Sequence, residues 1–272
     1  MPARPPPHTH LLESNSPPAE RVASPIPPPR NNRFMNDLED FFSRHDGRLI
    51  HKWHHYFEIY DRHFAKFRGQ PIHMVEFGVS QGGSLEMWRH YFGEQAQIYG
   101  VDINPNCKQF EGPGIQIFIG DQQDRHFLRD LAQSLPTIDI LIDDGGHTME
   151  QQIATYEELF PKLSPHGVYL IEDLHTSYWK GYGGGYRKHR TFIEYSKDFI
   201  DQLNAWHSHE PKRLSPSDFT KSVHSLHYYD SVLVIEKRPM VQPTHACKGQ
   251  ALFPDYEPPS LRLKDRIKRL FG

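Results

Sequence analysis

The chain has little cysteine and no long apolar run. Only two cysteines, Cys107 and Cys247, occur among 272 residues, which argues against a disulfide framework and for a reducing compartment. No stretch reaches the roughly 20 apolar residues of a membrane span, and the N-terminus lacks the apolar centre of a secretory signal. The net charge of −3 shows no basic excess of the kind that binds nucleic acid. We therefore expect a cytoplasmic protein with no nucleic-acid partner and no stable membrane insertion.

Prolines gather at one end of the chain. Ten of the 23 prolines lie within residues 1–33, and proline lacks the amide hydrogen that regular structure uses. We therefore expect a disordered tail over 1–33. Two helices are expected over 34–70, a core domain over 71–240, and a C-terminal tail over 241–272 with a short basic helix at 261–271.

The segment before the core is rich in aromatic residues and histidines. We expect its second helix over 50–67, with one stripe formed by Trp53, Phe57, Tyr60 and Phe64. Such helices suit a cover for the sheet, a lid, or the contact of a homo-oligomer. No acidic or cysteine ligand in the segment completes a metal site. We therefore interpret its histidines as surface residues, namely His51, His54, His55 and His63.

Strands and helices alternate through the core. The expected strands are 72–79, 97–102, 115–119, 138–143 and 167–172. Repeated βα units indicate a parallel sheet with helices on both faces. Two further strands, 222–228 and 231–237, are joined by a connection too short for a parallel crossover, so they pair antiparallel. The sequence thus predicts an α/β fold whose mostly parallel sheet ends in an antiparallel hairpin.

The dinucleotide fingerprint G-x-G-x-x-G is missing at the first strand-to-helix turn. Ser80 stands where the fingerprint has a glycine, although Gly78 and Gly82 still let a ligand approach the backbone closely. Glu76 precedes Gly78, and a carboxylate there repels a phosphate but suits a ligand with a cationic amino acid portion. These features oppose a nicotinamide-dependent dehydrogenase, which is one alternative for such a fold.

Polar residues after the next two strands extend this site. The second strand ends in Asp102, at the distance from the glycine turn where an acid binds ribose hydroxyls. Asp121 and Gln122 follow the third strand, where their side chains can meet an adenine edge. Each of these residues, taken alone, is also common in a turn or at a helix cap. The interpretation as a ligand site therefore depends on their occurrence after successive strands. The ligand that fits them is an adenosine that carries an amino acid, such as S-adenosylmethionine.

Two acidic segments follow the fourth and fifth strands. Asp144 comes at the end of the first strand, and Glu172 and Asp173 at the end of the second. If the strands are neighbours, the three carboxylates converge at the sheet edge where ligands bind, with His147 beside them. Crowded carboxylates repel one another unless a cation lies among them, and Mg²⁺ prefers oxygen ligands. The sequence therefore predicts a Mg²⁺ site beside a histidine base, a chemistry for activating an oxygen nucleophile.

With these motifs, the chain resembles class I S-adenosylmethionine-dependent methyltransferases, and more narrowly the metal-dependent macrocin and mycinamicin-type sugar O-methyltransferases of macrolide biosynthesis. The resemblance covers residues 74–237 and is carried by 76–83 and, more specifically, by 143–147 and 172–173. It implies a Rossmann-like seven-stranded sheet of order 3-2-1-4-5-7-6 with strand 7 antiparallel. The long N-terminal assembly domain of those enzymes has no counterpart here, so neither their assembly nor their exact substrate is carried over.

The resemblance also implies a role for each site residue. His147 would be the general base, and the Mg²⁺ ligands would be Asp144, Glu172 and Asp173. The cofactor, S-adenosyl-L-methionine, would be bound by Glu76, Gly78, Ser80, Gly82, Asp102, Asp121, Gln122 and Asp143. Its methyl group would pass to a hydroxyl of a sugar or glycoside, on a small molecule or a glycan.

A segment rich in glycine and aromatic residues follows Asp173. We interpret residues 174–186 as a substrate lid, with His175 as a second candidate base and with Tyr178 and Trp179 stacked on a sugar ring. Two alternatives stay open besides sugar methylation. One is a metal-dependent O-methyltransferase of a catechol-like small molecule, and the other is a noncatalytic nucleotide-binding module.

Overall fold

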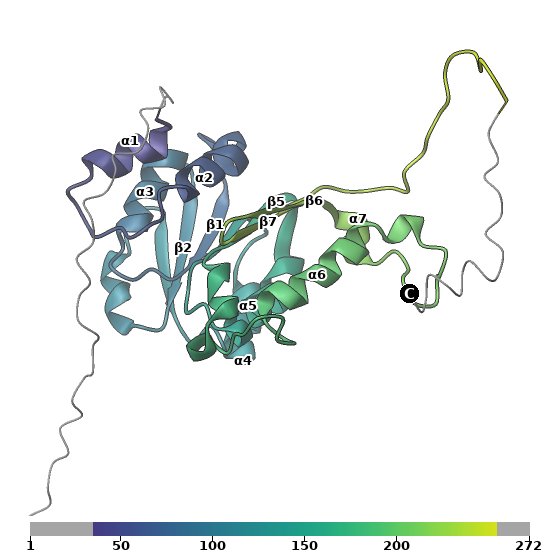
Figure 1. Cartoon of the computed structure of the whole chain (residues 1–272). Helices are drawn as coiled ribbons and strands as arrows, with labels where there is room; N and C mark the ends of the chain where they lie inside the picture. The colour runs from purple at the N-terminus through teal and green to yellow at the C-terminus, as the bar shows by residue number, and fades with distance from the viewer. Residues whose placement is uncertain (1–34, 255–272) are drawn as a thin grey trace, which may run out of the picture. The chain divides into compact units, whose positions relative to one another are not determined.

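A seven-stranded sheet forms the centre of the protein in the computed structural model, which describes residues 35–254 (Figure 1). The strands are β1 (His73–Phe77), β2 (Gln97–Asp102), β3 (Ile115–Ile119), β4 (Ile138–Asp143), β5 (Leu163–Ile171), β6 (Val223–Tyr229) and β7 (Val232–Lys237). Their order is β3-β2-β1-β4-β5-β7-β6, and β7 is antiparallel to both of its neighbours while the other pairs are parallel. The expected fold class, strand order and antiparallel hairpin are confirmed.

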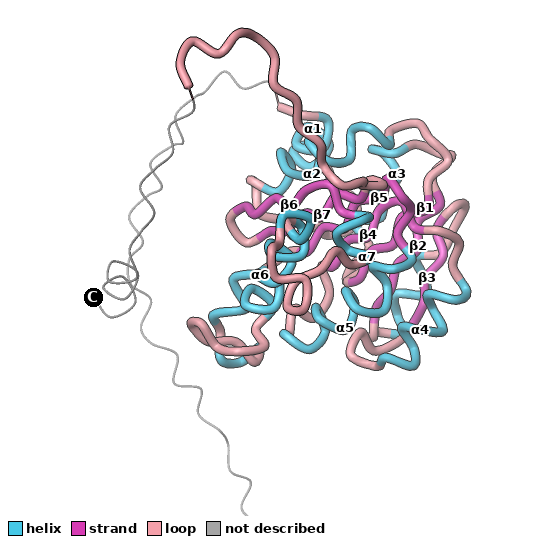
Figure 2. The backbone as a smooth tube through the Cα atoms, turned by 90° about the vertical axis from the view of Figure 1, so that its right-hand side faces the viewer, coloured by secondary structure: helices cyan, strands magenta, loops and turns pink. Residues whose placement is uncertain are grey.

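Helices cover both faces of the sheet (Figure 2). Successive side chains of a strand point to opposite faces, so Met74 of β1 joins one hydrophobic core and Val75 joins the other. The first core lies under α1 (Asp37–Arg44), α2 (Tyr56–Phe64) and α3 (Gly83–Phe92), and the second under α4 (Arg125–Ser134), α5 (Met149–Leu159) and α6 (Phe192–Leu203). Burial on both faces explains why central strands such as β4 and β7 are mostly apolar without alternation, whereas the edge strand β6 carries polar residues.

Short elements connect these parts. A five-residue helix, α7 (Asp218–Ser222), precedes β6. The 3-10 turns are η1 (Ala65–Phe67), η2 (Pro105–Phe110), η3 (Phe160–Lys162), η4 (Leu174–Tyr178), η5 (Lys180–Tyr182) and η6 (Ala205–His207). Within residues 35–254, no helix combines the length and the apolarity needed to cross a membrane. The tail expected over 1–33 and the basic helix expected near the C-terminus lie outside the described residues.

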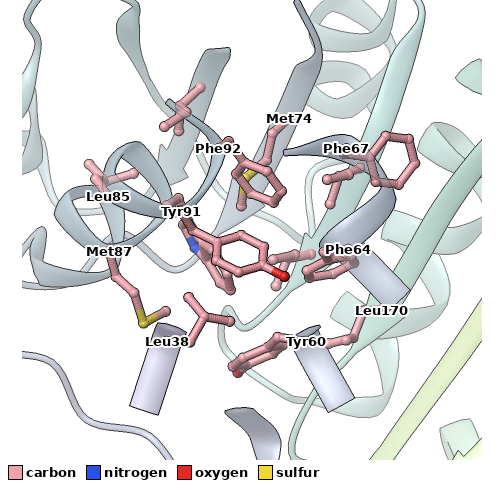
Figure 3. Close-up of a cluster of buried hydrophobic side chains, with 14 of the residues drawn as sticks. Leu38, Tyr60, Phe64, Phe67, Met74, Leu85, Met87, Tyr91, Phe92 and Leu170 are labelled. Atoms are coloured by element: carbon pink, nitrogen blue, oxygen red, sulfur yellow. The ribbon is translucent and has the colours of Figure 1, made fainter. Parts of the chain in front are cut away.

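The aromatic residues of α2 enter the same core as the sheet (Figure 3). The rings of Tyr60 and Phe64 meet the ring of Trp88 on α3 at centroid distances of 5.1 and 6.0 Å. Each buried aromatic side chain stabilises the fold by roughly 2–3 kcal/mol through removal of apolar surface from water. Helix α2 is therefore fixed to the sheet, and its side chains near the cavity have defined positions.

Two expectations for this segment are wrong. The helix expected over 50–67 begins only at Tyr56, and Trp53 lies before it with 52% of its surface exposed. The reason is tertiary: residues 49–53 line a cavity, and the side chain of Lys52 reaches carboxylates there. His63 is also not a surface residue, because only 3% of it is exposed.

Candidate active site

The carboxyl ends of three neighbouring strands are level with one another. Asp143 of β4 pairs with Phe77 of β1 on one side and with Ile171 of β5 on the other. The backbone amide of Asp144 then donates to the carbonyl of Phe77 at 3.1 Å, and that of Glu172 donates to the carbonyl of Asp143 at 2.9 Å. Gly78, Asp144 and Glu172, the residues that directly follow these three strands, therefore lie together at the carboxyl edge of the sheet.

Gly78 permits this close approach. Its φ of +91° lies in the left-handed region, and a Cβ at this position would stand 1.9 Å from the carbonyl oxygen of Asp144. Any other residue would have to displace the backbone that carries Asp144. The glycine in the loop therefore positions the acidic segment as well as leaving space for a ligand.

Asp144, His147 and Asp173 form a cluster at this edge. One ligand atom of each lies within 4.8 Å of the others. The Nε2 atom of His147 lies 3.7 Å from Oδ1 of Asp144 and 3.5 Å from Oδ2 of Asp173. His147 and Asp173 both have left-handed backbones, with φ of 54° and 53°, which is costly for residues other than glycine and concentrates at functional sites.

The cluster has the chemistry of a divalent-cation site. Its two carboxylates supply the oxygen ligands that Mg²⁺ prefers. The Nδ1 atom of His147 is buried and has no hydrogen-bond partner within the described part of the chain. A buried polar nitrogen without a partner is costly unless a ligand or water satisfies it. These residues therefore fit a bound cation and a substrate oxygen beside the imidazole.

Two hydroxyl groups hold the cluster in place. The hydroxyl of Tyr56 donates to Oδ1 of Asp173 at 2.8 Å. The hydroxyl of Thr176 lies 2.9 Å from the carbonyl oxygens of both His147 and Asp173, so it joins the two left-handed turns. Thr148 caps α5 directly after His147 and fixes the end of that turn.

Glu172 is engaged by Lys52 rather than by the cluster. The Lys52 ammonium lies 3.0 Å from both carboxylate oxygens of Glu172 and also contacts Asp144, while the Tyr60 hydroxyl donates to Glu172 at 2.6 Å. Burial alone would lower the pKa of Lys52, but the charges of Asp144 and Glu172 raise it above its ordinary value. Burial, with the charge of Asp144, raises the pKa of Glu172 well above its usual range.

A cavity of about 510 Å³ runs from this cluster along the sheet edge to the ends of β2 and β3. That volume is typical of ligand sites. Of the expected cofactor residues, Gly78, Ser80, Asp102, Asp121 and Gln122 line it. Asp102 accepts the backbone amide of Ser80 at 2.8 Å, and the neighbouring Ile103, 67% exposed, also faces the cavity.

Other expected cofactor residues are turned into the protein. The carboxylate of Glu76 accepts hydrogen bonds from Ser84 and Trp88, both at 2.8 Å, and burial raises its pKa to about 7. Glu76 follows Met74 by two residues, so it shares that residue's buried face of the sheet. Gly82 precedes α3 as its cap, and it lies outside the residues that line the cavity.

Asp143 and Gln122 form a buried pair behind the acidic segment. The Gln122 amide donates to Asp143 at 2.6 Å and to Thr155 at 2.9 Å, and its oxygen accepts the amide of Gly146 at 3.0 Å. Asp143 points to the face opposite Asp144 because successive strand residues alternate. The structure therefore places Asp143 beneath the cavity, where it supports the turn that carries His147.

The expected lid is an ordered run of short turns. Trp179 is 50% exposed and Tyr178 is 51% exposed, so neither ring is buried in the core. The imidazole of His175 is held by Ser231 at 2.5 Å and lies between Trp179 and Trp53, at centroid distances of 4.6 and 6.1 Å. Trp53 lines the cavity, so aromatic rings continue from the cavity to the protein surface.

Sequence reasoning missed the residues that hold the carboxylates. Lys52, Tyr56, Tyr60 and Thr176 carry no motif. Tyr60 shares helical spacing with core residues, so the sequence predicts packing for it and not a role in the site. Tyr56 lies outside the predicted aromatic stripe. The lysine gave no signal, because only the fold brings residue 52 next to residues 144 and 172.

The sheet order and the cavity at its carboxyl edge define a Rossmann-like methyltransferase fold. Residues 75–174 match the family model described as a methyltransferase domain. This match begins within β1, continues through β5 and includes every residue of the acidic cluster. The chain therefore contains a methyltransferase domain.

Curated relatives of the chain are named as O-methyltransferases. The chain is 39% identical over 201 residues to 8-demethyl-8-alpha-L-rhamnosyl tetracenomycin-C 2'-O-methyltransferase of Streptomyces olivaceus, covering 69% of this chain and 52% of that protein. It is 36% identical over 214 residues to demethylmacrocin O-methyltransferase of Streptomyces fradiae, covering 74% and 53%. The chain thus spans about half the length of the curated relatives it matches.

A solved structure of similar sequence contains the expected metal together with SAH, the product that S-adenosylmethionine leaves after methyl transfer. It is the MycE methyltransferase from the mycinamycin biosynthetic pathway in complex with Mg and SAH, with a TM-score of 0.69 and 33% identity. The match covers 75% of this chain and 55% of that one. The resemblance to the metal-dependent sugar O-methyltransferases is therefore confirmed.

Proposed function

We propose that this protein is a Mg²⁺-assisted O-methyltransferase that transfers the methyl group of S-adenosylmethionine to a hydroxyl of a sugar or glycoside. The observation that carries the proposal is the convergence of Asp144, His147 and Asp173 beside one cavity. The relatives act on rhamnosyl tetracenomycin and demethylmacrocin by their names, which supports a glycoside acceptor.

Asp144 and Asp173 are the side chains we assign to the metal. Oxygens of both lie within 3.7 Å of Nε2 of His147. The expected third ligand, Glu172, stays a prediction, because the Lys52 ammonium binds Asp144 as well as Glu172 and does not set the two apart. When bound, the ion supplies stabilisation of the negative charge that develops on the reacting oxygen. Lys52 supplies a positive charge to Asp144 and Glu172 and so limits the repulsion between these two carboxylates.

His147 is the proton acceptor in this proposal. As the acceptor hydroxyl oxygen forms its bond to the methyl carbon, the carbon–sulfur bond breaks and the hydroxyl proton passes to the imidazole. The turn that carries His147 is fixed by Thr176 and by the Thr148 cap, so the ring needs little reorganisation. The products are the methyl ether and S-adenosylhomocysteine.

The cavity wall supports the cofactor assignment. Gly78 and Ser80 would face the amino acid portion, and Asp102 has oxygen lone pairs left for ribose hydroxyls after it accepts two backbone amides. Exposed Ile103 would pack against adenine next to Asp121. Glu76 and Asp143 would act from behind this wall through the hydrogen bonds described above, and Gln122, which lines the cavity, binds both Asp143 and the amide of Gly146.

The acceptor would enter past the aromatic rings. Trp179 and Tyr178 are half-exposed close to Asp173 in the chain, and tryptophan faces stack on the apolar side of a sugar ring. In our proposal His175 packs with these aromatic rings and does not accept the proton, because its Nδ1 atom is bound to the Ser231 hydroxyl. Limited proteolysis with and without cofactor and acceptor tests closure of residues 174–186: unchanged cleavage would argue against a lid.

Three further expectations stay predictions. A cytoplasmic location accords with two free cysteines, Cys107 and Cys247. A homo-oligomer and the absence of a nucleic-acid partner await measurement of mass and binding in solution. Methylation of a catechol-like molecule requires the same paired oxygens, so only acceptor preference separates it from sugar methylation.

The test is a labelled-methyl assay with S-adenosylmethionine and a panel of rhamnosides, other glycosides and catechols. We expect label in a glycoside, and a loss of at least about 100-fold in kcat for His147→Ala, since a positioned base contributes roughly that much. His166→Ala, an exposed histidine of β5, is the matched control and should keep full activity. Full activity of His147→Ala would contradict the proposal, and label in catechols alone would favour the alternative acceptor.

A further inference from the structure

A second group of metal-binding side chains lies at the opposite end of α2 from the active site. His63 near the end of α2, His227 of β6 and Glu236 of β7 each offer one ligand atom, and these atoms lie within 4.8 Å of one another. The set combines two imidazoles with one carboxylate, which suits ions that bind nitrogen, such as Zn²⁺. It contrasts with the oxygen ligands at the active site.

The geometry of His63 is that of an oriented ligand. Its Nε2 atom lies 2.9 Å from the hydroxyl of Tyr229, while its Nδ1 atom faces Oε1 of Glu236 at 2.9 Å. Metal-binding histidines usually have the second ring nitrogen fixed by such a partner. Because only 3% of His63 is exposed, packing also restricts the ring.

Ser225 contacts the other two ligands, His227 and Glu236, and both are partly open to solvent. A hydrogen bond of 2.9 Å joins Nε2 of His227 to the hydroxyl of Ser225, and Ser225 also lies 3.4 Å from Oε2 of Glu236. The His227 and His63 rings are 4.7 Å apart at 61°. His227 and Glu236 are partly exposed, so an ion can enter from solvent.

The spacing needs only a small adjustment to bind an ion. Two nitrogen ligands at about 2.1 Å from one Zn²⁺ ion lie at most about 4.2 Å apart. The ligand atoms of His63, His227 and Glu236 lie within 4.8 Å of one another, so side-chain rotations that move them by about an ångström bring them to binding distance. The ammonium of Lys66 lies 3.9 Å from Glu236. Its positive charge disfavours cations such as Mg²⁺ that bind mainly through attraction to carboxylates, and favours ions that also bond to histidine nitrogen.

We propose that His63, His227 and Glu236 bind one transition-metal ion of the Zn²⁺ type, at a site separate from the Mg²⁺ site. The ion would replace the hydrogen bond between His63 and Glu236 and leave the one from His63 to Tyr229 in place. It would fasten the end of α2 to the edge of the sheet, where β6 and β7 lie. This inference does not depend on the proposed methyl transfer.

The ion would also steady the active site through α2. The same helix carries Tyr56 and Tyr60, whose hydroxyls hold Asp173 and Glu172. Fastening the helix at His63, one to two turns further along, restricts the position of both tyrosines. The proposed site is therefore structural, and it acts on the carboxylates of Asp173 and Glu172 only through the two tyrosines of α2.

The test uses Co²⁺ as a coloured probe for the full chain, stripped of metal and then saturated with Mg²⁺ to fill the oxygen site. We expect one equivalent of Co²⁺ to bind with the visible absorption of a nitrogen-ligated ion, and Zn²⁺ to displace it. His227→Ala and Glu236→Gln should each weaken binding at least about tenfold. Glu236→Gln keeps a hydrogen-bond acceptor for His63, which guards against a folding defect.

The matched control is His224→Ala, an exposed histidine of the same strand β6, which should bind Co²⁺ as the wild type does. Zn²⁺ should also slow hydrogen exchange of the α2 amides in the wild type and not in Glu236→Gln. The inference is overturned if His227→Ala and Glu236→Gln bind Co²⁺ like the wild type. It is equally overturned if the wild type binds no stoichiometric Co²⁺, since 19 histidines give any such chain weak, scattered binding.

Discussion

Replacement of Lys52 by methionine tests how the carboxylates of the site are kept together. The side chains of Lys52 and Glu172 are 3% and 1% exposed, and the ammonium lies 3.0 Å from the Glu172 carboxylate. At an effective dielectric constant of about 20, one such contact is worth roughly 5 kcal/mol before the cost of desolvation is subtracted. Removal of one member of a buried ion pair leaves the other charge uncompensated and costs about 3–5 kcal/mol.

We therefore expect Lys52→Met to lower the free energy of unfolding by about 3–5 kcal/mol, a loss of roughly 10 °C in Tm for a domain of this size. The assay is urea unfolding at neutral pH with EDTA, followed by circular dichroism. The double variant Lys52→Met/Glu172→Gln should regain at least half of the loss, because it removes the more deeply buried of the two carboxylates that Lys52 contacts, with Asp144 left partly exposed to water. Lys66→Met, which removes a half-exposed lysine, should cost no more than about 1 kcal/mol.

The reasoning is refuted if Lys52→Met is as stable as Lys66→Met. It is also refuted if the double variant is no more stable than the single one, because the loss would then have a cause other than charge. Neither result bears on methyl transfer, so the experiment separates the stability of the site from its chemistry.

Three other variants give sharp expectations. Burial raises the pKa of Glu76 to about 7, above its unfolded value, so this carboxyl alone should lower the free energy of unfolding by about 3 kcal/mol as the pH rises from 5 to above 8. In urea unfolding, the fall over this pH range should therefore be smaller by about that amount in Glu76→Gln than in the wild type, while the part due to Glu172 stays in both; equal falls would contradict the prediction. Gly78→Ala places a Cβ against the carbonyl of Asp144 and should weaken S-adenosylmethionine binding in calorimetry at least about tenfold, while Gly69→Ala, left-handed but in open space, should not. Thr176→Val should lower kcat about tenfold with little change in the KM for cofactor, and Thr176→Ser should restore it; a KM effect alone would show that the two turns do not depend on this hydroxyl.

The sheet could be predicted from the sequence because its strands are buried on both faces. The runs at 97–102, 115–119 and 138–143 are apolar and bounded by turn residues, and the observed strands have the same limits. The short link before Val232 fixed the antiparallel pairing of the last two strands. Helical periodicity predicts a helix over residues 50–55, whereas the observed helix begins at Tyr56. The conformation of this segment depends on contacts with residues far along the chain, and a local pattern contains no information on them.

The candidate site was predictable only where residues follow strands directly. Asp144 and Asp173 stand at strand ends, so parallel topology alone brought them together with His147. The side-chain directions of Glu76 and Asp143 depend on the alternation within each strand, and both turned out to face the interior. The partners of Glu172 come from α2 and from Lys52, and no local pattern connects these residues.

The metal dependence of turnover tests the central claim most directly. Methyl transfer to the preferred glycoside would be measured against free Mg²⁺ for the wild type, Asp144→Asn and Asp173→Asn, after treatment with EDTA. We predict that EDTA abolishes turnover, that Mg²⁺ restores it in the wild type, and that each variant needs at least about tenfold more Mg²⁺ or stays inactive. Full turnover of the wild type in EDTA, or variants with the wild-type response to Mg²⁺, would contradict the account.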